Sequence, residues 1–181
     1  KDQIIAVSGG GKKEFFEKVY REIFPVVIKV SYHITRNMEA AQDVCQEAFI
    51  KFYHRPNPLS NIDEARYWLI RVVKNLSFNY LEHEKVRTRA FEKMVKTESV
   101  YTDDTGEKSL LKKETVSLVN DALEKLPEKL RVPVILREFG GMNYKEIAKV
   151  LGISESNVKI RIFRGREALE NLLNRGEVYV P

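Results

Sequence analysis

The sequence predicts an all-α fold of two small helical domains joined by a flexible linker, with a helix-turn-helix in the C-terminal domain. Apolar residues recur at helical spacing along most of the chain, and few alternating runs could form a sheet. A polar stretch rich in turn formers, residues 97–108, interrupts this pattern and is typical of a linker. We therefore expect a first domain over residues 1–92, a linker over 93–112 and a second domain over 113–181.

Composition narrows the class of protein. Of the 181 residues, 43% are hydrophobic and 31% are charged, which is ordinary for a globular protein. The net charge of +5 and the isoelectric point near 9.2 suit a polyanionic partner but do not require one. The sequence has neither an apolar run long enough to span a membrane nor a signal peptide, so we expect no membrane insertion and a cytoplasmic protein. The single Cys45 has apolar neighbours and is expected to be a buried, unreactive thiol.

The start of the first domain is expected to be helical. Residues 2–8 form a short helix that Gly9–Gly11 ends as a turn, because this triplet lacks the rest of a phosphate-binding loop. The next helix runs from Lys13 to Ile34, and Pro25 should kink it. A further helix over Asn37–Tyr53 has its apolar residues largely on one side, at Ala41, Val44, Ala48, Ile50 and Phe52.

The remaining helices follow from their breakers and caps. The prolines of Arg55–Pro58 predict a loop, after which Asp63 is expected to cap a helix over Glu64–Arg89. In the second domain, helical spacing predicts one helix over 110–126 and another over 128–138.

Residues 143–170 carry the pattern of a helix-turn-helix. Ala148 is small enough for close helix packing, Gly152 can adopt the left-handed turn, and Ser154 can cap the second helix. A buried stripe of Val158, Ile162 and Leu169 then leaves the polar side chains outward, namely Glu155, Ser156, Asn157, Lys159, Arg161 and Arg164. Such a helix can enter the major groove of DNA. A plain helical hairpin with solvated charges is the alternative, and the coincidence of these residues favours DNA binding.

Two blocks in the first half add to this pattern. The first runs from Asp43 to Tyr53 and reads Asp, then Gln-Glu, then an aromatic residue; the second runs from Ala65 to Leu81 and contains Trp68 and Asn75. With the helix-turn-helix, they resemble the extracytoplasmic-function sigma factors, the smallest class of bacterial RNA polymerase sigma subunits. The resemblance covers roughly residues 3–172.

The resemblance implies a polymerase-binding helix in the first domain. In the family, the helix of the first block docks on the clamp of the largest polymerase subunit. The matching residues are Asp43, Gln46, Glu47 and Phe49. A polar ridge beside an aromatic anchor suits a protein interface, although an ordinary amphipathic helix would show the same pattern.

The second block resembles the family segment that opens and reads the minus-ten promoter element. Asn75 and the loop Arg55–Ile62 would frame a pocket for a flipped base. The other implied DNA-binding residues of this helix and its extension are Arg71, Lys74, Asn79, Lys85, Arg87 and Arg89. Trp68 lies on an apolar face and is either a core residue or a stacking platform, with the core favoured.

In the second domain, the resemblance implies recognition of the minus-thirty-five element. The residues at or near the family's DNA-facing positions are Ser156, Asn157, Lys159, Arg161, Phe163 and Arg164. Ile160 stands where the family often has a small polar residue, so it either contacts a thymine methyl group or points away from DNA. The preceding helices, about 114–138, would grip the polymerase flap.

The function implied is that of a non-catalytic transcription initiation factor without cofactor or metal. Its partners would be core RNA polymerase, promoter DNA and an anti-sigma protein. A stand-alone helix-turn-helix regulator with a sensing or dimerisation domain over residues 1–95 is the alternative, but it does not account for the two blocks. An enzyme is disfavoured, because the histidines are scattered and Asp103-Asp104 lies in the polar linker.

Overall fold

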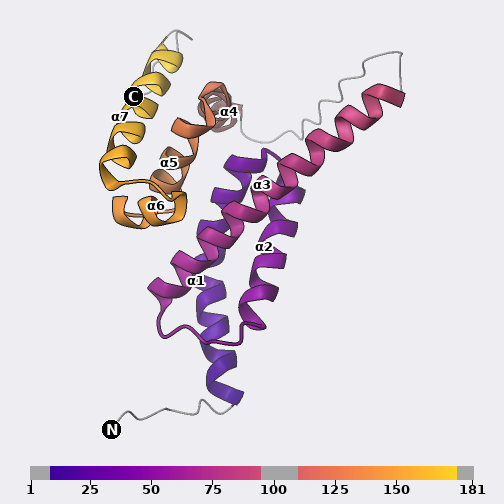
Figure 1. Cartoon of the computed structure of the whole chain (residues 1–181), viewed down its shortest axis with the longest axis vertical. Helices are drawn as coiled ribbons and strands as arrows, with labels where there is room; N and C mark the ends of the chain where they lie inside the picture. Colours follow the sequence, from indigo (N-terminus) through magenta and orange to yellow (C-terminus); the bar gives the residue numbers. More distant parts are fainter. Residues whose placement is uncertain (1–8, 95–109, 175–181) are drawn as a thin grey trace. The chain divides into compact units, whose positions relative to one another are not determined.

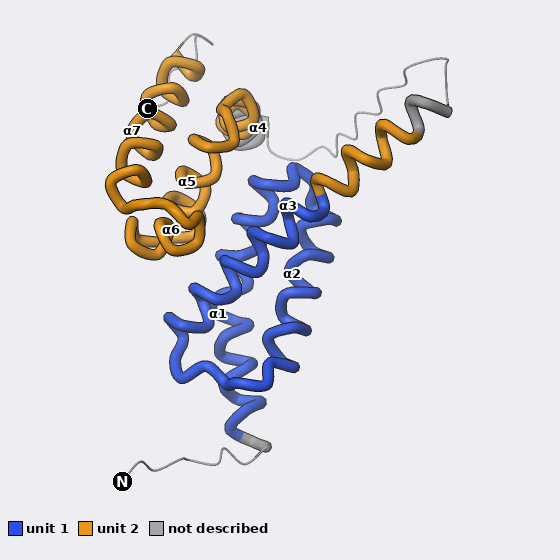
Figure 2. Tube along the Cα trace, viewed as in Figure 1, with its two compact units in different colours: residues 1–80 blue, residues 81–181 orange. Residues whose placement is uncertain are grey.

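The computed structural model describes residues 9–94 and 110–174, and every regular element within them is an α-helix (Figure 1). The chain divides into two compact units, residues 1–80 and 81–181, and the division falls within one long helix (Figure 2). The all-α class is confirmed. Of the expected linker over 93–112, only its two ends are described, and both are helical.

The first unit is built on three helices: α1 (Gly9–Thr35), α2 (Met38–Tyr53) and the first part of α3 (Ile62–Met94). They bury side chains spaced three or four residues apart, and each fully buried valine, leucine or isoleucine contributes about 1.5–3 kcal/mol. This core contains Val19, Ile23, Val27, Val30, Val44, Ala48, Leu69, Ile70 and Val73.

The N-terminal half of α1 differs from expectation. The glycine triplet Gly9–Gly11 does not end a helix but begins one, and the expected helix over 2–8 lies outside the described residues. Glycine costs about 1 kcal/mol relative to alanine in a helix, and the long buried face that follows offsets this cost. Pro25 also lies within α1 and does not end it.

Two asparagines cap the helices that follow. The Asn37 side chain accepts a hydrogen bond from the Ala40 amide (3.1 Å) at the start of α2. At α3 the expected cap, Asp63, was wrong: it lies in the first turn, and Asn61 accepts from the Glu64 amide (2.9 Å) instead. Both residue types cap well, so the sequence alone could not decide between positions two residues apart.

A buried hydroxyl pair joins α1 to α3. The Ser31 and Ser77 hydroxyl oxygens lie 2.9 Å apart, and neither side chain is exposed to solvent. A hydroxyl buried without a partner costs about 1–3 kcal/mol, so the pair favours the one packing of α1 against α3 that satisfies both groups.

The second unit holds α4 (Leu110–Lys125), α5 (Glu128–Glu138), α6 (Tyr144–Leu151) and α7 (Glu155–Asn174). Helix α7 packs against each of the other three. Its core combines Leu123, Leu126 and Val134 with the half-buried Ala168, Leu169 and Leu172 of α7.

Helices α5 and α7 approach closely at one glycine. A Cβ atom on Gly165 would lie 2.7 Å from Val134 Cγ2 and 3.3 Å from the Leu130 carbonyl oxygen. Because no side chain fits there, Gly165 fixes how α7 sits on α5. None of the described helices is long and apolar enough to cross a membrane.

Candidate nucleic-acid and protein interfaces

The turn between α6 and α7 has the geometry that the sequence predicts. Gly152 ends α6 in the left-handed conformation (φ 67°), and its amide donates to the Ala148 carbonyl oxygen. The Ser154 hydroxyl accepts from the Asn157 amide (3.2 Å) and so caps the start of α7. The helix-turn-helix is therefore confirmed.

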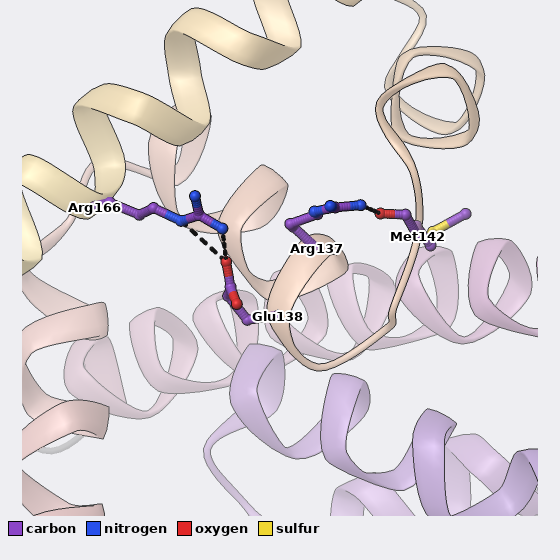
Figure 3. A network of polar contacts seen from close by, with 4 residues as sticks. All are labelled: Arg137, Glu138, Met142 and Arg166. Carbon is purple, nitrogen blue, oxygen red and sulfur yellow. Dashed lines mark hydrogen bonds and ion pairs between the residues drawn. The ribbon is translucent and has the colours of Figure 1, made fainter.

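The start of α6 is held by its own cap and by a contact from α5. Asn143 and Glu146 form a capping box, with hydrogen bonds of 2.9 and 2.8 Å. Arg137 Nη1 donates to the Met142 carbonyl oxygen (2.8 Å), and beside it the Arg166 guanidinium of α7 pairs with Glu138 (Figure 3). These contacts join α5 to the segment before α6 and to α7.

Helix α7 separates a buried stripe from an outward face. Val158, Ile162 and Gly165 are buried, and Leu169 extends the stripe as a half-buried residue. At about 100° per residue, Ser156, Ile160 and Arg164 lie on the opposite side of the helix. All three are exposed.

The predicted DNA-facing residues of α7 fall into a centre and two flanks. Ser156, Phe163 and Arg164 are exposed towards the centre of the outward face. Asn157 and Arg161 lie on one flank, half-buried and joined by a hydrogen bond from Arg161 Nε to Asn157 Oδ1 (2.9 Å).

The other flank of α7 lies near Tyr144, a residue that the sequence analysis did not single out. Lys159 is exposed there and lies 5.8 Å from the centre of the Tyr144 ring, and the Arg137 guanidinium lies 4.9 Å from the same ring. Tyr144, at the start of α6, is thus close to two cations. An aromatic residue directly after an Asn cap and before a basic helix was the available signal.

The predicted minus-ten residues lie on α3, mostly on one face. Arg71, Asn75 and Asn79 are exposed at four-residue spacing, opposite the buried Leu69 and Val73. Lys74 lies beside them with its ammonium 5.8 Å from the centre of the Phe78 ring.

The basic residues further along α3 are paired. Lys85 Nζ lies 2.7 Å from Glu82 Oε1, and Arg87 Nη2 lies 2.9 Å from Glu84 Oε2. At about 100° per residue, Arg87 lies about 160° around the helix from Arg71. The structure therefore does not bring Arg87 onto the face of the other predicted minus-ten residues.

The loop after α2 lines an apolar pocket of about 390 Å³. Its walls come from the loop and from the facing ends of α1 and α2, and its lining includes Phe15, Phe16, Phe52, Tyr53, Arg55, Pro56, Pro58 and Leu59. Asn75, which was expected to frame a pocket with this loop, does not line this one. Trp68 is half-buried, with its ring 5.9 Å from that of Phe52 and 5.1 Å below the Arg55 guanidinium, so it is neither fully core nor a bare platform.

The predicted ridge of α2 is present except for its aromatic member. Asp43, Gln46 and Glu47 are exposed on one side of the helix, and Lys51 pairs with Glu47 at 3.2 Å. Ile50, expected to face inward, is 53% exposed and lies between them on the same side. Other residues form the buried side of α2, and the position of Ile50 on the helix turns its side chain outward.

Phe49 was expected on this surface but is only 3% exposed. Its ring packs within 4.9–6.1 Å of the rings of Phe16, Tyr20 and Phe24 on α1. Together they line a groove of about 540 Å³ whose rim includes Gln42, Gln46, Ile50, Tyr53 and His54. Phe49 thus lines the groove but is hardly exposed, because its ring packs against the aromatic side chains of α1.

Groups suited to metal or redox chemistry are few among the described residues. No group of three or more histidine, cysteine or acidic residues there could hold a metal ion. Cys45 is buried, and burial raises the pKa of its thiol to about 12, which keeps it protonated and unreactive. What the described surfaces offer is binding: a basic helical face with exposed apolar residues, and a mixed polar and aromatic groove.

Two families match separate parts of the chain. Residues 19–87 match sigma-70 region 2, and residues 117–169 match sigma-70 region 4. The first match covers the α2 ridge and the α3 face, and the second covers the helix-turn-helix.

Similar proteins match over most of their length. The RNA polymerase sigma-H factor of Pseudomonas aeruginosa is 31% identical over 173 residues, which cover 90% of this chain and 88% of that protein. The ECF RNA polymerase sigma-E factor of Escherichia coli K12 is 32% identical over 183 residues, covering 94% and 93%. That of Haemophilus influenzae is 31% identical over 172 residues, covering 91% and 90%.

Solved structures share the fold. The sigma factor RpoE in its complex with the anti-sigma factor NepR from Bartonella quintana has a TM-score of 0.65, at 22% identity over 88% of this chain and 96% of that one. CnrH, in complex with the cytosolic domain of CnrY, also has a TM-score of 0.65, at 22% identity over 92% of both chains. Together with the two region matches and the full-length relatives, this similarity shows that the chain belongs to the extracytoplasmic-function sigma factors of RNA polymerase.

Proposed function

We propose that the α2 ridge and its groove bind core RNA polymerase, that α3 opens the minus-ten element, and that α7 reads the minus-thirty-five element. The protein is a non-enzymatic initiation factor that directs core polymerase to promoters. The observation that carries the assignment of surfaces is the outward face of α7, whose basic and apolar side chains stand free of the unit's core.

For the polymerase, the supporting observation is the combination of Gln46 and Ile50 on the rim of an aromatic groove. Protein interfaces characteristically place apolar and aromatic anchors within a polar rim. The clamp of the largest subunit is the expected partner of this surface. The flap is expected to contact the helices before the helix-turn-helix.

Reconstituted transcription tests these assignments. Purified chain and core polymerase are expected to give promoter-dependent run-off transcripts, and Ile50→Asp is expected to abolish the complex with core by placing a charge on the groove rim. Lys29→Ala, an exposed change on α1 away from the groove, is the matched control. A chain that binds operator DNA tightly as a dimer, with no complex with core, would instead support the stand-alone regulator. The match of residues 19–87 to sigma-70 region 2 does not favour that alternative.

Strand opening can be separated from binding. Asn75→Ala is expected to leave the polymerase complex intact and to reduce the fluorescence of 2-aminopurine placed in the minus-ten element, because an exposed amide that holds an unpaired base is lost. Equal fluorescence for this variant and the parent chain would remove Asn75 from the opening step.

Regulation by an anti-sigma protein is part of the proposal. A sigma factor with this fold was solved in complex with an anti-sigma factor, and CnrH, which shares the fold, was solved in complex with the cytosolic domain of CnrY. We expect an anti-sigma protein of the same bacterium to compete with core polymerase for this chain. Titrating that protein into the complex of the chain with core polymerase should dissociate the complex. Because polymerase and promoter DNA meet there, we place the protein in the bacterial cytoplasm.

A further inference from the structure

The outward face of α7 carries two exposed apolar side chains. Among residues 118–174, the large hydrophobic side chains that stand exposed are Ile160 (51%) and Phe163 (69%). Exposed apolar groups that lie together on a small unit mark a contact surface, since water disfavours them. Their neighbours on the helix are polar or charged.

Ile160 lies at the centre of this face. At about 100° per residue, it is about 170° around the helix from the middle of the buried stripe. The cations next to it in sequence lie on the flanks: Lys159 is near the Tyr144 ring, and Arg161 donates a hydrogen bond to Asn157. Ile160 therefore points out of the unit, on the face of α7 that the proposed function places in the major groove.

The chemistry of isoleucine restricts what it can read. Its side chain has no hydrogen-bond donor or acceptor, and the apolar group that the four base pairs present in the major groove is the C5-methyl of thymine. We propose that Ile160 is a specificity determinant of this chain that selects a thymine in the upstream promoter element through its methyl group. This inference rests on the proposed entry of α7 into the major groove.

Phe163 does not replace Ile160 in this role. It lies about 60° around the helix, towards Lys159, and so faces a different part of the groove. A substitution at each position should therefore alter preference at a different base pair.

A thermodynamic cycle between protein and DNA tests the assignment. The upstream element is first selected from a random library by the chain bound to core polymerase. Each thymine of the selected element is then replaced, one at a time, by deoxyuridine, which lacks only the methyl group. For the parent chain, one such replacement is expected to weaken binding about fourfold, as for the loss of one buried methyl-sized group. Ile160→Ala is expected to bind the thymine and uracil forms equally at that position, while Glu170→Ala keeps the fourfold difference. Selection with Ile160→Ser should lose the thymine there.

The outcomes separate this inference from the function on which it rests. If the complex forms and selects an element, but Ile160→Ala distinguishes thymine from uracil as the parent chain does at every position, the role of Ile160 is overturned alone. A selected element without any thymine preference overturns it too. If no complex with core forms, the proposed function fails and this inference fails with it. Ile160→Ala should unfold at the parent temperature, because the side chain is exposed and lies outside the buried stripe of α7.

Discussion

Individual residues set the properties of the two units through what surrounds them. Cys45 and Gly165 are both small and both buried, yet one fills space beside apolar neighbours and the other leaves room for a second helix. Cys45 leads to a prediction about the pH dependence of stability, and Gly165 leads to one about the packing of two helices.

Cys45 is expected to make the free energy of unfolding decrease at alkaline pH. Burial raises the pKa of its thiol from 9.0 to about 12, so the folded state keeps a proton that the unfolded chain loses. The contribution is fully present below pH 9 and is lost as pH rises towards 12. Denaturant titrations across this range should show a decline for the parent chain that is smaller for Cys45→Ala. A thiol reagent at pH 8 should modify Cys45 only as fast as the chain unfolds; faster modification would contradict its burial.

Gly165 should tolerate no side chain. The Cβ of Gly165→Ala would lie 2.7 Å from Val134 Cγ2, which forces α5 and α7 apart. We expect a loss of about 1–3 kcal/mol in the free energy of unfolding. Combining the change with Val134→Ala should recover part of that loss, and two fully additive losses would show that the clash is not its cause.

At the scale of elements, sequence rules succeeded for helices whose ends are set by the residues that directly flank them. The bounds of α5 follow from Pro127 and those of α6 and α7 from Gly152 and Ser154, because breakers and caps act locally. Residues 9–11 were misplaced because the cost of a few glycines is small against the packing of the long helix that follows.

The surfaces were harder to predict than the elements. Ile50 and Phe49 are adjacent apolar residues, and which of them turns outward depends on where α1 crosses α2. The contact of Tyr144 with Lys159 likewise joins residues on two helices, so spacing within either helix carries no sign of it. The face of α7 was predicted well, because a regular stripe on one helix defines its opposite side.

The capping box of α6 should contribute measurably to the second unit. Asn143→Ala removes the acceptor for the Glu146 amide and leaves a short helix without its first cap. We expect a loss of about 1 kcal/mol, read from thermal unfolding of the full chain. Asn143→Ser should retain most of the stability, and an Ala variant as stable as the parent would show that the box is dispensable.

For the whole molecule, charge and two-site binding decide how strongly it holds a promoter. A net charge of +5 gives only modest attraction to DNA, so binding by the chain alone is expected to be weak. Core polymerase that holds both units raises the effective concentration of each for its own element.

The salt dependence of promoter binding should reveal which side chains meet phosphates. If Arg164 contacts a phosphate, Arg164→Ala lowers the magnitude of the slope of log K against log salt by about 1. Ile160→Ala should leave that slope unchanged, since it carries no charge. Equal slopes for Arg164→Ala and the parent polymerase complex would place Arg164 away from the backbone.

The separation of stripe and face on α7 has an evolutionary consequence. The residues that hold the helix to its unit, such as Val158, Ile162 and Gly165, are not the residues that point outward. Mutations on the outward face can therefore accumulate without a penalty in folding, and a duplicated copy of the gene could drift towards a new set of promoters while its fold stays intact. The same property makes the face a suitable place to build regulators that ignore the promoters of their host.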